Sequence, residues 1–221
     1  MNPDGSPGFR ACTADDAAAA VPLIHDSGPI AFRYVFAHRH EAQSLEFLRT
    51  AFCDGDGEFG FRNHLVAERA GAVIAVAALW DARANLRFTV AAARQILRFY
   101  RTAAPAVILR GLRMERVVKP AAPGVAYIGH VAVAPALRGQ GAGRALLGDL
   151  LGRARSEGYA RAALDVAATN PRARALYEGL GFRTVATRRS VLQGPWGRVP
   201  DHHYMVLDLG RESWYGTTPG I

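Results

Sequence analysis

Residues 138–143 read Arg-Gly-Gln-Gly-Ala-Gly, between an alternating apolar run at 127–133 and a helical run that begins near Arg144. A strand that feeds a glycine-rich turn and then a helix presents free backbone N–H groups at the helix N-terminus. This arrangement binds pyrophosphate. Glycine is needed because such a backbone must bend sharply and approach the diphosphate closely. The stretch therefore predicts a site for a phosphate-bearing cofactor.

The spacing of the glycines distinguishes three kinds of phosphate-binding loop. A Walker loop requires a lysine and a hydroxyl residue after its last glycine, and neither follows Gly143. A Rossmann loop fits only loosely, because Arg144 occupies its third glycine position and the acidic residue expected further on would be Asp165. The pattern Arg-x-x-Gly-x-Gly fits best, with Arg138, Gly141 and Gly143.

A second motif lies at residues 170–182, which read Asn-Pro-Arg-Ala-Arg-Ala-Leu-Tyr-Glu-Gly-Leu-Gly-Phe. In this order and spacing the two motifs resemble the signatures of the GCN5-related N-acetyltransferase (GNAT) family, of which the first binds acetyl-CoA. The resemblance covers residues 125–189, and the N-terminal half matches only in its general pattern. It implies an α/β fold in one domain, with helices on both faces of a mixed, mostly antiparallel sheet that is splayed between its fourth and fifth strands.

The resemblance implies acetyl-CoA as the cofactor, with its pantetheine arm in the gap between the splayed strands. The backbone of Val131 and Val133 would pair with this arm. Asn170 would bind the arm or hold the strands apart, besides capping its own helix. Arg138 would bind phosphate or cap the loop. The predicted cofactor-binding residues are Val131, Val133, Arg138, Gly139, Gln140, Gly141, Ala142, Gly143, Arg144 and Asn170.

Two residues are candidates for the chemistry. The resemblance places Tyr177 near the thioester sulfur, where its hydroxyl would protonate the departing thiolate; the alternative is a core aromatic. His130 lies on the fourth strand, where related enzymes often carry a carboxylate, and the strand pattern points it toward the acceptor. Histidine takes up a proton near neutral pH, which suits a general base. Glu68, Asp81 and water are alternative bases, and a histidine without a catalytic role is the other interpretation of His130.

Hydrophobic periodicity predicts the other elements and the domain organisation. Residues 1–8 are expected to be disordered, 9–209 to form the GNAT-like domain, and 210–221 to be a C-terminal tail. Predicted helices span 13–24, 41–52, 84–101, 105–117, 144–157 and 171–178. Predicted strands span 9–12, 63–68, 72–80, 127–133, 161–166, 183–189 and 203–209, with the run at 161–166 parallel to the strand before it.

Residues 81–123 depart from the family pattern, which joins the third and fourth strands by a tight turn. The segment predicts an inserted pair of helices. The first carries one apolar stripe, formed by Leu86, Val90, Ala93, Leu97 and Tyr100. We expect the insertion to be a lid over the acceptor side that controls specificity. A homodimer surface and a membrane-surface face are the alternatives.

Composition and charge exclude several other classes of protein. The net charge is +8, but Lys119 is the one lysine among 27 basic residues, and aromatic and basic residues are not interleaved, so we do not expect nucleic-acid binding. No apolar run approaches the about 18 residues of a membrane span. The first residues lack a secretory signal, and a cytoplasmic location is expected. Cys12 and Cys53 lack metal-site spacing, and the acidic turn 54–58 lacks the calcium-loop pattern, so no metal is expected.

The leading hypothesis is an N-acetyltransferase that moves acetyl from acetyl-CoA to a primary amine of a small molecule or peptide. The amine would attack directly within a ternary complex. One alternative is a catalytically silent acyl-CoA-binding sensor. The other is a basic module that binds nucleic acid or a membrane surface through the inserted helices.

Overall fold

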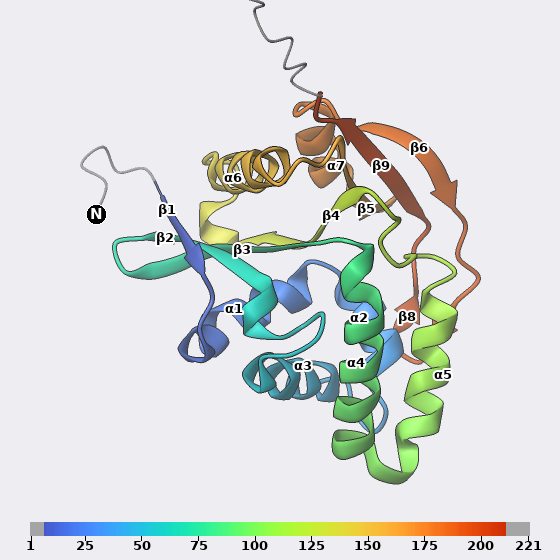
Figure 1. Cartoon of the computed structure of the whole chain (residues 1–221). Helices are drawn as coiled ribbons and strands as arrows, with labels where there is room; N and C mark the ends of the chain where they lie inside the picture. Colours follow the sequence, from blue (N-terminus) through green and yellow to red (C-terminus); the bar gives the residue numbers. More distant parts are fainter. Residues whose placement is uncertain (1–6, 211–221) are drawn as a thin grey trace, which may run out of the picture.

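The computed structural model describes residues 7–210, which form one central sheet between two groups of helices (Figure 1). Seven strands make up this sheet: β1 Gly8–Ala11, β2 His64–Arg69, β3 Ala72–Trp80, β4 Val125–Val133, β5 Arg161–Ala167, β6 Arg183–Arg188 and β9 His202–Asp208. Their order is β1-β2-β3-β4-β5-β9-β6. Every neighbouring pair is antiparallel except β4 and β5, which are parallel. The predicted fold class is confirmed.

The two parallel strands separate soon after they meet. Val125–Tyr127 of β4 pair with Arg161–Ala163 of β5, but β4 continues to Val133 and β5 to Ala167. Beyond Tyr127 the backbone of β4 has no strand partner among residues 7–210 on the β5 side, while β3 still pairs with it on the other side. The sheet therefore contains the predicted splay, and its opening lies along the second half of β4.

Helices cover both faces of the sheet (Figure 1). One face carries α6 Ala142–Ser156 and α7 Pro171–Glu178; the other carries α1 Ala17–Asp26, α2 Pro29–Phe36, α3 Gln43–Asp54, α4 Asn85–Tyr100 and α5 Ala104–Met114. Each face has its own buried core. The sequence did not predict α2, because Gly28 and Pro29 suggested only a break. Pro29 instead stands in the first turn of α2, where its missing N–H costs nothing. The short hairpin of β7 Gln193–Gly194 and β8 Gly197–Arg198 was also not expected.

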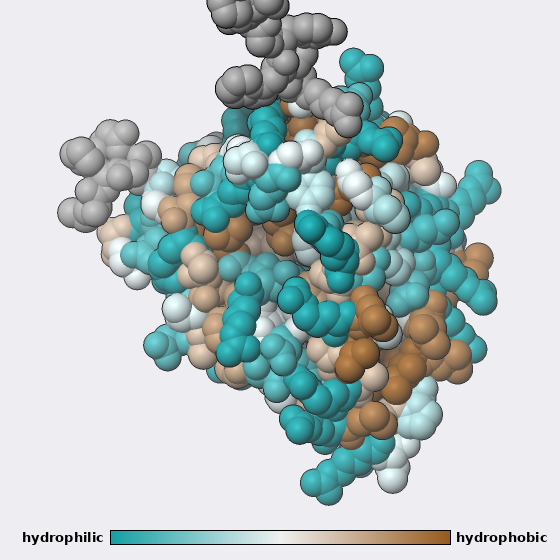
Figure 2. All heavy atoms as spheres, in the orientation of Figure 1, coloured by the Kyte–Doolittle hydropathy of each residue, from teal (hydrophilic) through white to brown (hydrophobic). Residues whose placement is uncertain are grey.

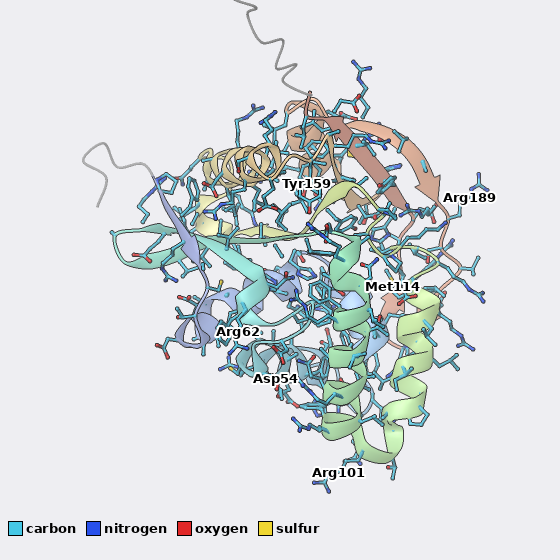
Figure 3. The ribbon with its side chains drawn as sticks, viewed as in Figure 1. Asp54, Arg62, Arg101, Met114, Tyr159 and Arg189 are labelled. Atoms are coloured by element: carbon cyan, nitrogen blue, oxygen red, sulfur yellow. The ribbon has the colours of Figure 1, made fainter. Side chains whose placement is uncertain are left out.

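The predicted insertion is a helical hairpin, α4 and α5, between β3 and β4. It is fixed to the body of the protein at several points. The Tyr100 hydroxyl donates to the carbonyl of Phe36, and Arg110 Nη1 donates to the carbonyl of Ala37 at 3.0 Å. Arg94 pairs with Asp54 of α3 at 2.6 Å. Figure 3 shows Arg101 at the far tip of the hairpin and Met114 at the end nearer the sheet.

Most of the apolar stripe that we predicted on α4 faces outward. Leu86, Val90 and Leu97 are 75%, 61% and 55% exposed, whereas Tyr100, the last residue of the predicted stripe, is buried. The helix is buried instead through a second face, which includes Phe88, Ala91, Gln95, Ile96 and Tyr100. Exposed Leu109 and Leu112 of α5 extend the outer stripe, and Figure 2 shows apolar surface over both helices. The hairpin therefore has two apolar faces, and periodicity alone did not show which one packs.

The ends of the chain lie mostly outside the described residues. This applies to the predicted disordered segment 1–8 and tail 210–221, although Gly8 already belongs to β1. Within residues 7–210 no helix is long and apolar enough to cross a membrane. Cys12 is buried, Cys53 is exposed, and both are free thiols.

Candidate active site

The glycine-rich turn joins β4 to α6 and has the conformation that its glycines allow. Gly139 and Gly141 have φ of 87° and 84°, in the left-handed region that other residues rarely adopt. Gly141 is the N-cap of α6. A Cβ on Gly143 would lie 3.2 Å from Val133 Cγ2 and 3.5 Å from Leu176 Cδ2, so close packing requires glycine there as well.

This turn presents a row of unused backbone donors. Within residues 7–210, no backbone acceptor is present for the amides of Gly139, Gly141, Ala142, Gly143 and Arg144. They lie at the positive end of the α6 dipole, which favours an anion. The turn therefore fits a diphosphate through its backbone alone.

The two arginines of the turn are bound to protein groups. Arg138 Nε donates to the Val133 carbonyl at 3.0 Å, and its Nη2 lies 3.7 Å from Asp26 Oδ2. Arg144 Nη2 donates to the Gly179 carbonyl at 3.1 Å. Of the two roles considered for Arg138, the structure shows the loop cap. Contact of either arginine with phosphate stays a prediction.

The predicted pantetheine contacts line the open side of β4. Val131 and Val133 are half-buried against the core beneath α6, and their backbone lies beyond the last β4–β5 pair. Asn170 Oδ1 accepts from the Ala173 amide at 3.1 Å and so caps α7. In the structure Asn170 therefore acts as a helix cap, and contact of Asn170 with the cofactor stays a prediction.

Tyr177 lies on α7 and is buried in the same core. Its ring packs edge-on against Phe182, with centroids 6.1 Å apart. Burial raises the pKa of Tyr177 to about 12, so the phenol is neutral near pH 7 and able to donate a proton. Its hydroxyl has no hydrogen-bond partner in the described part of the chain.

His130 projects from an irregularity in β4. Ala78 of β3 pairs with Gly129 and Val76 pairs with Ala132, so two residues of β4 oppose one residue of β3. This is a β-bulge, and His130 takes a φ of 55° within it. The bulge turns the imidazole to the face that carries α1–α5, opposite the cofactor turn.

Aromatic side chains surround the imidazole of His130. The ring centroids of Phe32, Phe59 and Trp80 lie 6.1, 5.4 and 5.7 Å from it. The His130 side chain is only 8% exposed. Gly129 is required beside it, because a Cβ at that position would collide with the Trp80 ring. Segments that are distant in sequence therefore form this aromatic cluster around His130.

Two polar residues that contact His130 were missed by sequence reasoning. The ring of His64 lies edge to edge with that of His130, with centroids 5.2 Å apart, and its Nε2 lies 3.0 Å from His130 Nδ1. Glu58 Oε1 lies 3.3 Å from His130 Nε2. A histidine in the apolar strand β2 was the one available signal. Nothing local pointed to Glu58, which had been considered only as part of an acidic turn.

The carboxylates considered as alternative bases have other partners. Glu68 accepts from Arg10 Nε at 2.7 Å. Asp81 accepts from Arg83 Nε at 2.6 Å and from the Tyr159 hydroxyl at 2.8 Å. Glu58 is therefore the carboxylate that contacts His130. Among residues 7–210, no three His, Cys, Asp or Glu side chains lie together as a metal-binding group.

Comparison with known proteins agrees with this geometry. The model of a family described as "Acetyltransferase (GNAT) family" matches residues 31–182, most of the chain. The chain belongs to the GNAT acetyltransferase family. The ribosomal protein bS18-alanine N-acetyltransferase of Escherichia coli K12 is 42% identical over 69 residues, which cover 31% of this GNAT protein and 47% of the relative. The chain thus matches about half the length of this curated relative.

Solved structures share the fold across nearly the whole chain. An N-acetyltransferase from Staphylococcus aureus Mu50 has a TM-score of 0.67 and 17% identity, over 90% of this chain and all of that one. A phosphinothricin acetyltransferase from Sinorhizobium meliloti, in complex with acetyl-CoA, has a TM-score of 0.54 and 21% identity, over 98% of this chain and 95% of that one. At these identities the solved structures show the fold alone, and the family model over residues 31–182 carries the assignment to the GNAT acetyltransferases.

Proposed function

We propose that this GNAT protein transfers acetyl from acetyl-CoA to a primary amine by direct attack, with His130 as the base and Tyr177 as the acid. The observation that carries the proposal is the position of His130. The bulge in β4 points its imidazole away from the cofactor turn, at the part of β4 where the strands have separated. The base and the predicted thioester position would then share one strand.

The chain's own groups divide the reaction as follows. The amides of the turn bind the diphosphate, and β4 aligns the pantetheine arm. His130 takes one proton from the ammonium form of the acceptor and passes it to solvent, and the neutral nitrogen then attacks the thioester carbonyl. As the carbon–sulfur bond breaks, Tyr177 gives its phenolic proton to the sulfur. The proton that the new amide nitrogen loses returns to Tyr177 through solvent, so protons balance.

We propose that the acceptor is a primary amine. The Escherichia coli relative is named for an alanine of a ribosomal protein, which supports including a peptide N-terminus among the candidates. Polyamines, amino acids and other small amines stay candidate acceptors as well. A cytoplasmic location, a homodimer and the absence of nucleic-acid binding stay predictions.

The test is thiol release from acetyl-CoA with a panel of primary amines that includes an alanine-terminated peptide. We expect release with at least one amine. His130→Ala should lower the rate about a hundredfold below neutral pH, where the acceptor is protonated, and less at high pH, because general base help is typically worth at least that much. His40→Ala, at a half-exposed histidine remote from β4, is the control. CoA binding without thiol release from any amine would favour the silent sensor instead.

A further inference from the structure

Three side chains from separate segments form one row behind the proposed base. Nδ1 of His64 lies 2.9 Å from the carbonyl oxygen of Gly60, and Nε2 of His64 lies 3.0 Å from Nδ1 of His130. Nε2 of His130 in turn lies 3.3 Å from Oε1 of Glu58. His64 is fully enclosed at 1% exposure, whereas the Glu58 side chain is 40% exposed. The row therefore runs from the protein interior to the surface.

The carbonyl of Gly60 fixes the protons along this row. A carbonyl oxygen only accepts, so Nδ1 of His64 carries a proton. Burial lowers the pKa of His64 to about 3, so its ring is neutral near pH 7 and its Nε2 is an acceptor. His130 must then donate from Nδ1. The nitrogen of His130 that gains and loses a proton is therefore Nε2, which faces Glu58.

Neutral His130 and Glu58 present two acceptors to each other. At 3.3 Å the Nε2 lone pair and the carboxylate oxygen repel, unless a donor lies against both. A primary ammonium ion has three N–H groups and a positive charge, so it can donate to both acceptors at once. An acceptor that arrives protonated suits this pair of groups better than a neutral amine.

We propose that Glu58 and His130 together bind the acceptor as an ammonium ion and take its proton, while His64 is a positioning residue that fixes the tautomer of His130. This inference rests on the function proposed above. One N–H bond of the ammonium breaks, its electron pair stays on nitrogen, and the proton bonds to Nε2. The resulting imidazolium is stabilised by the Glu58 carboxylate and by the three surrounding aromatic rings. The proton then leaves to solvent at the exposed end of the row.

The charged groups around His130 favour a cation there. Glu58 comes from the loop after α3. Glu115 follows α5, and burial together with the negative charge of Glu58 raises its pKa. His64 on β2 is neutral, and burial raises the pKa of Tyr127 on β4, so neither adds charge near pH 7. The acceptor side of a chain with net charge +8 thus carries carboxylates.

The tautomer of His130 is measured directly by ¹⁵N NMR of histidine-labelled full-length protein, with His130→Ala to identify its signals. We expect Nδ1 to be protonated. His64→Gln should keep this tautomer, because its amide oxygen can accept from Nδ1–H. His64→Leu removes the acceptor and should move the proton to Nε2, with turnover at least tenfold lower. Unchanged tautomer and turnover in His64→Leu would overturn the positioning role; should that variant not fold, loss of the tautomer in His64→Gln would do so.

The ammonium site is tested separately with Glu58→Gln, which keeps the side-chain shape and removes the charge. With a good acceptor from the panel, kcat/KM below neutral pH should fall at least tenfold, mainly through KM. Glu46→Gln, from the exposed Glu46–His40 pair at 4.0 Å, is the matched control. An unchanged KM in Glu58→Gln would overturn the ammonium site.

The two proposals fail in different ways. If no amine is acetylated, the proposed function and the proposed ammonium site are both wrong, while the tautomer measurement still decides the role of His64. If amines are acetylated but neither His64→Leu nor Glu58→Gln behaves as expected, the proposed roles of His64 and Glu58 are wrong and the proposed transferase function still holds.

Discussion

The proposed cofactor side of this GNAT protein is made by one continuous stretch of chain, whereas the proposed acceptor side is assembled from several distant segments. β4, the glycine-rich turn, α6, β5 and α7 follow one another in sequence. The proposed acceptor side instead combines Phe32, Glu58, His64, Trp80 and His130. The first side offers backbone amides and the second offers side chains. A backbone site depends on local conformation, which glycine can set, but a side-chain site depends on how the whole domain packs.

The two sides meet on β4. Val131 and Val133 belong to the core beneath α6, while His130, between Gly129 and Val131, belongs to the opposite face. The bulge makes this possible, because one extra residue on β4 reverses the alternation of side chains. One strand thus holds both the predicted pantetheine contacts and the proposed base.

The largest expected effect is the loss of CoA binding when the glycine-rich turn is changed. CoA at about a hundred times its Kd should stabilise the protein by about 2.7 kcal/mol, or about 5–10 °C in Tm. Gly141→Val should remove this shift, because valine cannot readily adopt the left-handed φ of 84° that directs the free amides. The shift is measured by thermal unfolding with and without CoA.

Gly158 provides the matched control for that substitution. It follows the last turn of α6 with a φ of 82°, and, as at Gly141, no atom of residues 7–210 lies within 4 Å of where a Cβ would be. Gly158→Val should therefore impose the same backbone strain and lower Tm, yet keep the CoA shift. A Gly141→Val protein that is stabilised by CoA as strongly as wild type would show that the turn does not bind the diphosphate.

The difference between the two sides also explains which features the sequence could predict. The turn and α7 were predictable because their signals are local: glycines at fixed spacing, and Asn170-Pro171 at the start of a helix. The mostly antiparallel sheet and its splay followed from the resemblance that those motifs carry. Glu58 and His64 were not predictable, because only the packing of α3, β2 and β4 brings them to His130.

The inserted hairpin shows the same limit in a different way. Its existence and its approximate bounds followed from the length between β3 and β4 and from the periodicity. Its orientation did not, because α4 has two apolar faces and the one with Phe88 and Tyr100 packs against the protein. Which face is buried depends on complementary shape in α2 and α3, and no local pattern in α4 records it.

The second largest expected effect is a lower turnover rate without a change in CoA affinity, which separates catalysis from cofactor binding. Tyr177→Phe should lower kcat roughly a hundredfold and leave CoA affinity nearly unchanged, because the hydroxyl acts only as sulfur departs. Single-turnover kinetics and a CoA titration measure the two quantities. The buried ring and its contact with Phe182 are preserved in phenylalanine, so the fold should not change. Undiminished turnover would leave Tyr177 as a core aromatic with no part in the chemistry.

The smallest expected effect tests whether the hairpin contributes to acceptor choice. Glu115 caps the C-terminal end of α5 and lies close enough to Glu58 for the two charges to interact. A diamine has a second positive charge that Glu115 can attract, and a monoamine does not. Because Glu115 is largely solvent-exposed, its contribution should be modest, about two- to fivefold in KM, and weaker in high salt. Glu115→Gln should therefore raise KM for a diamine by that factor, with little change for a monoamine or for CoA.

The control is Glu157→Gln, which alters the corresponding C-cap of α6 and should leave KM for both acceptors unchanged. If the diamine-to-monoamine ratio of KM is the same in wild type and Glu115→Gln at low salt, the hairpin does not select acceptors through this charge, and its role reduces to covering α2 and α3.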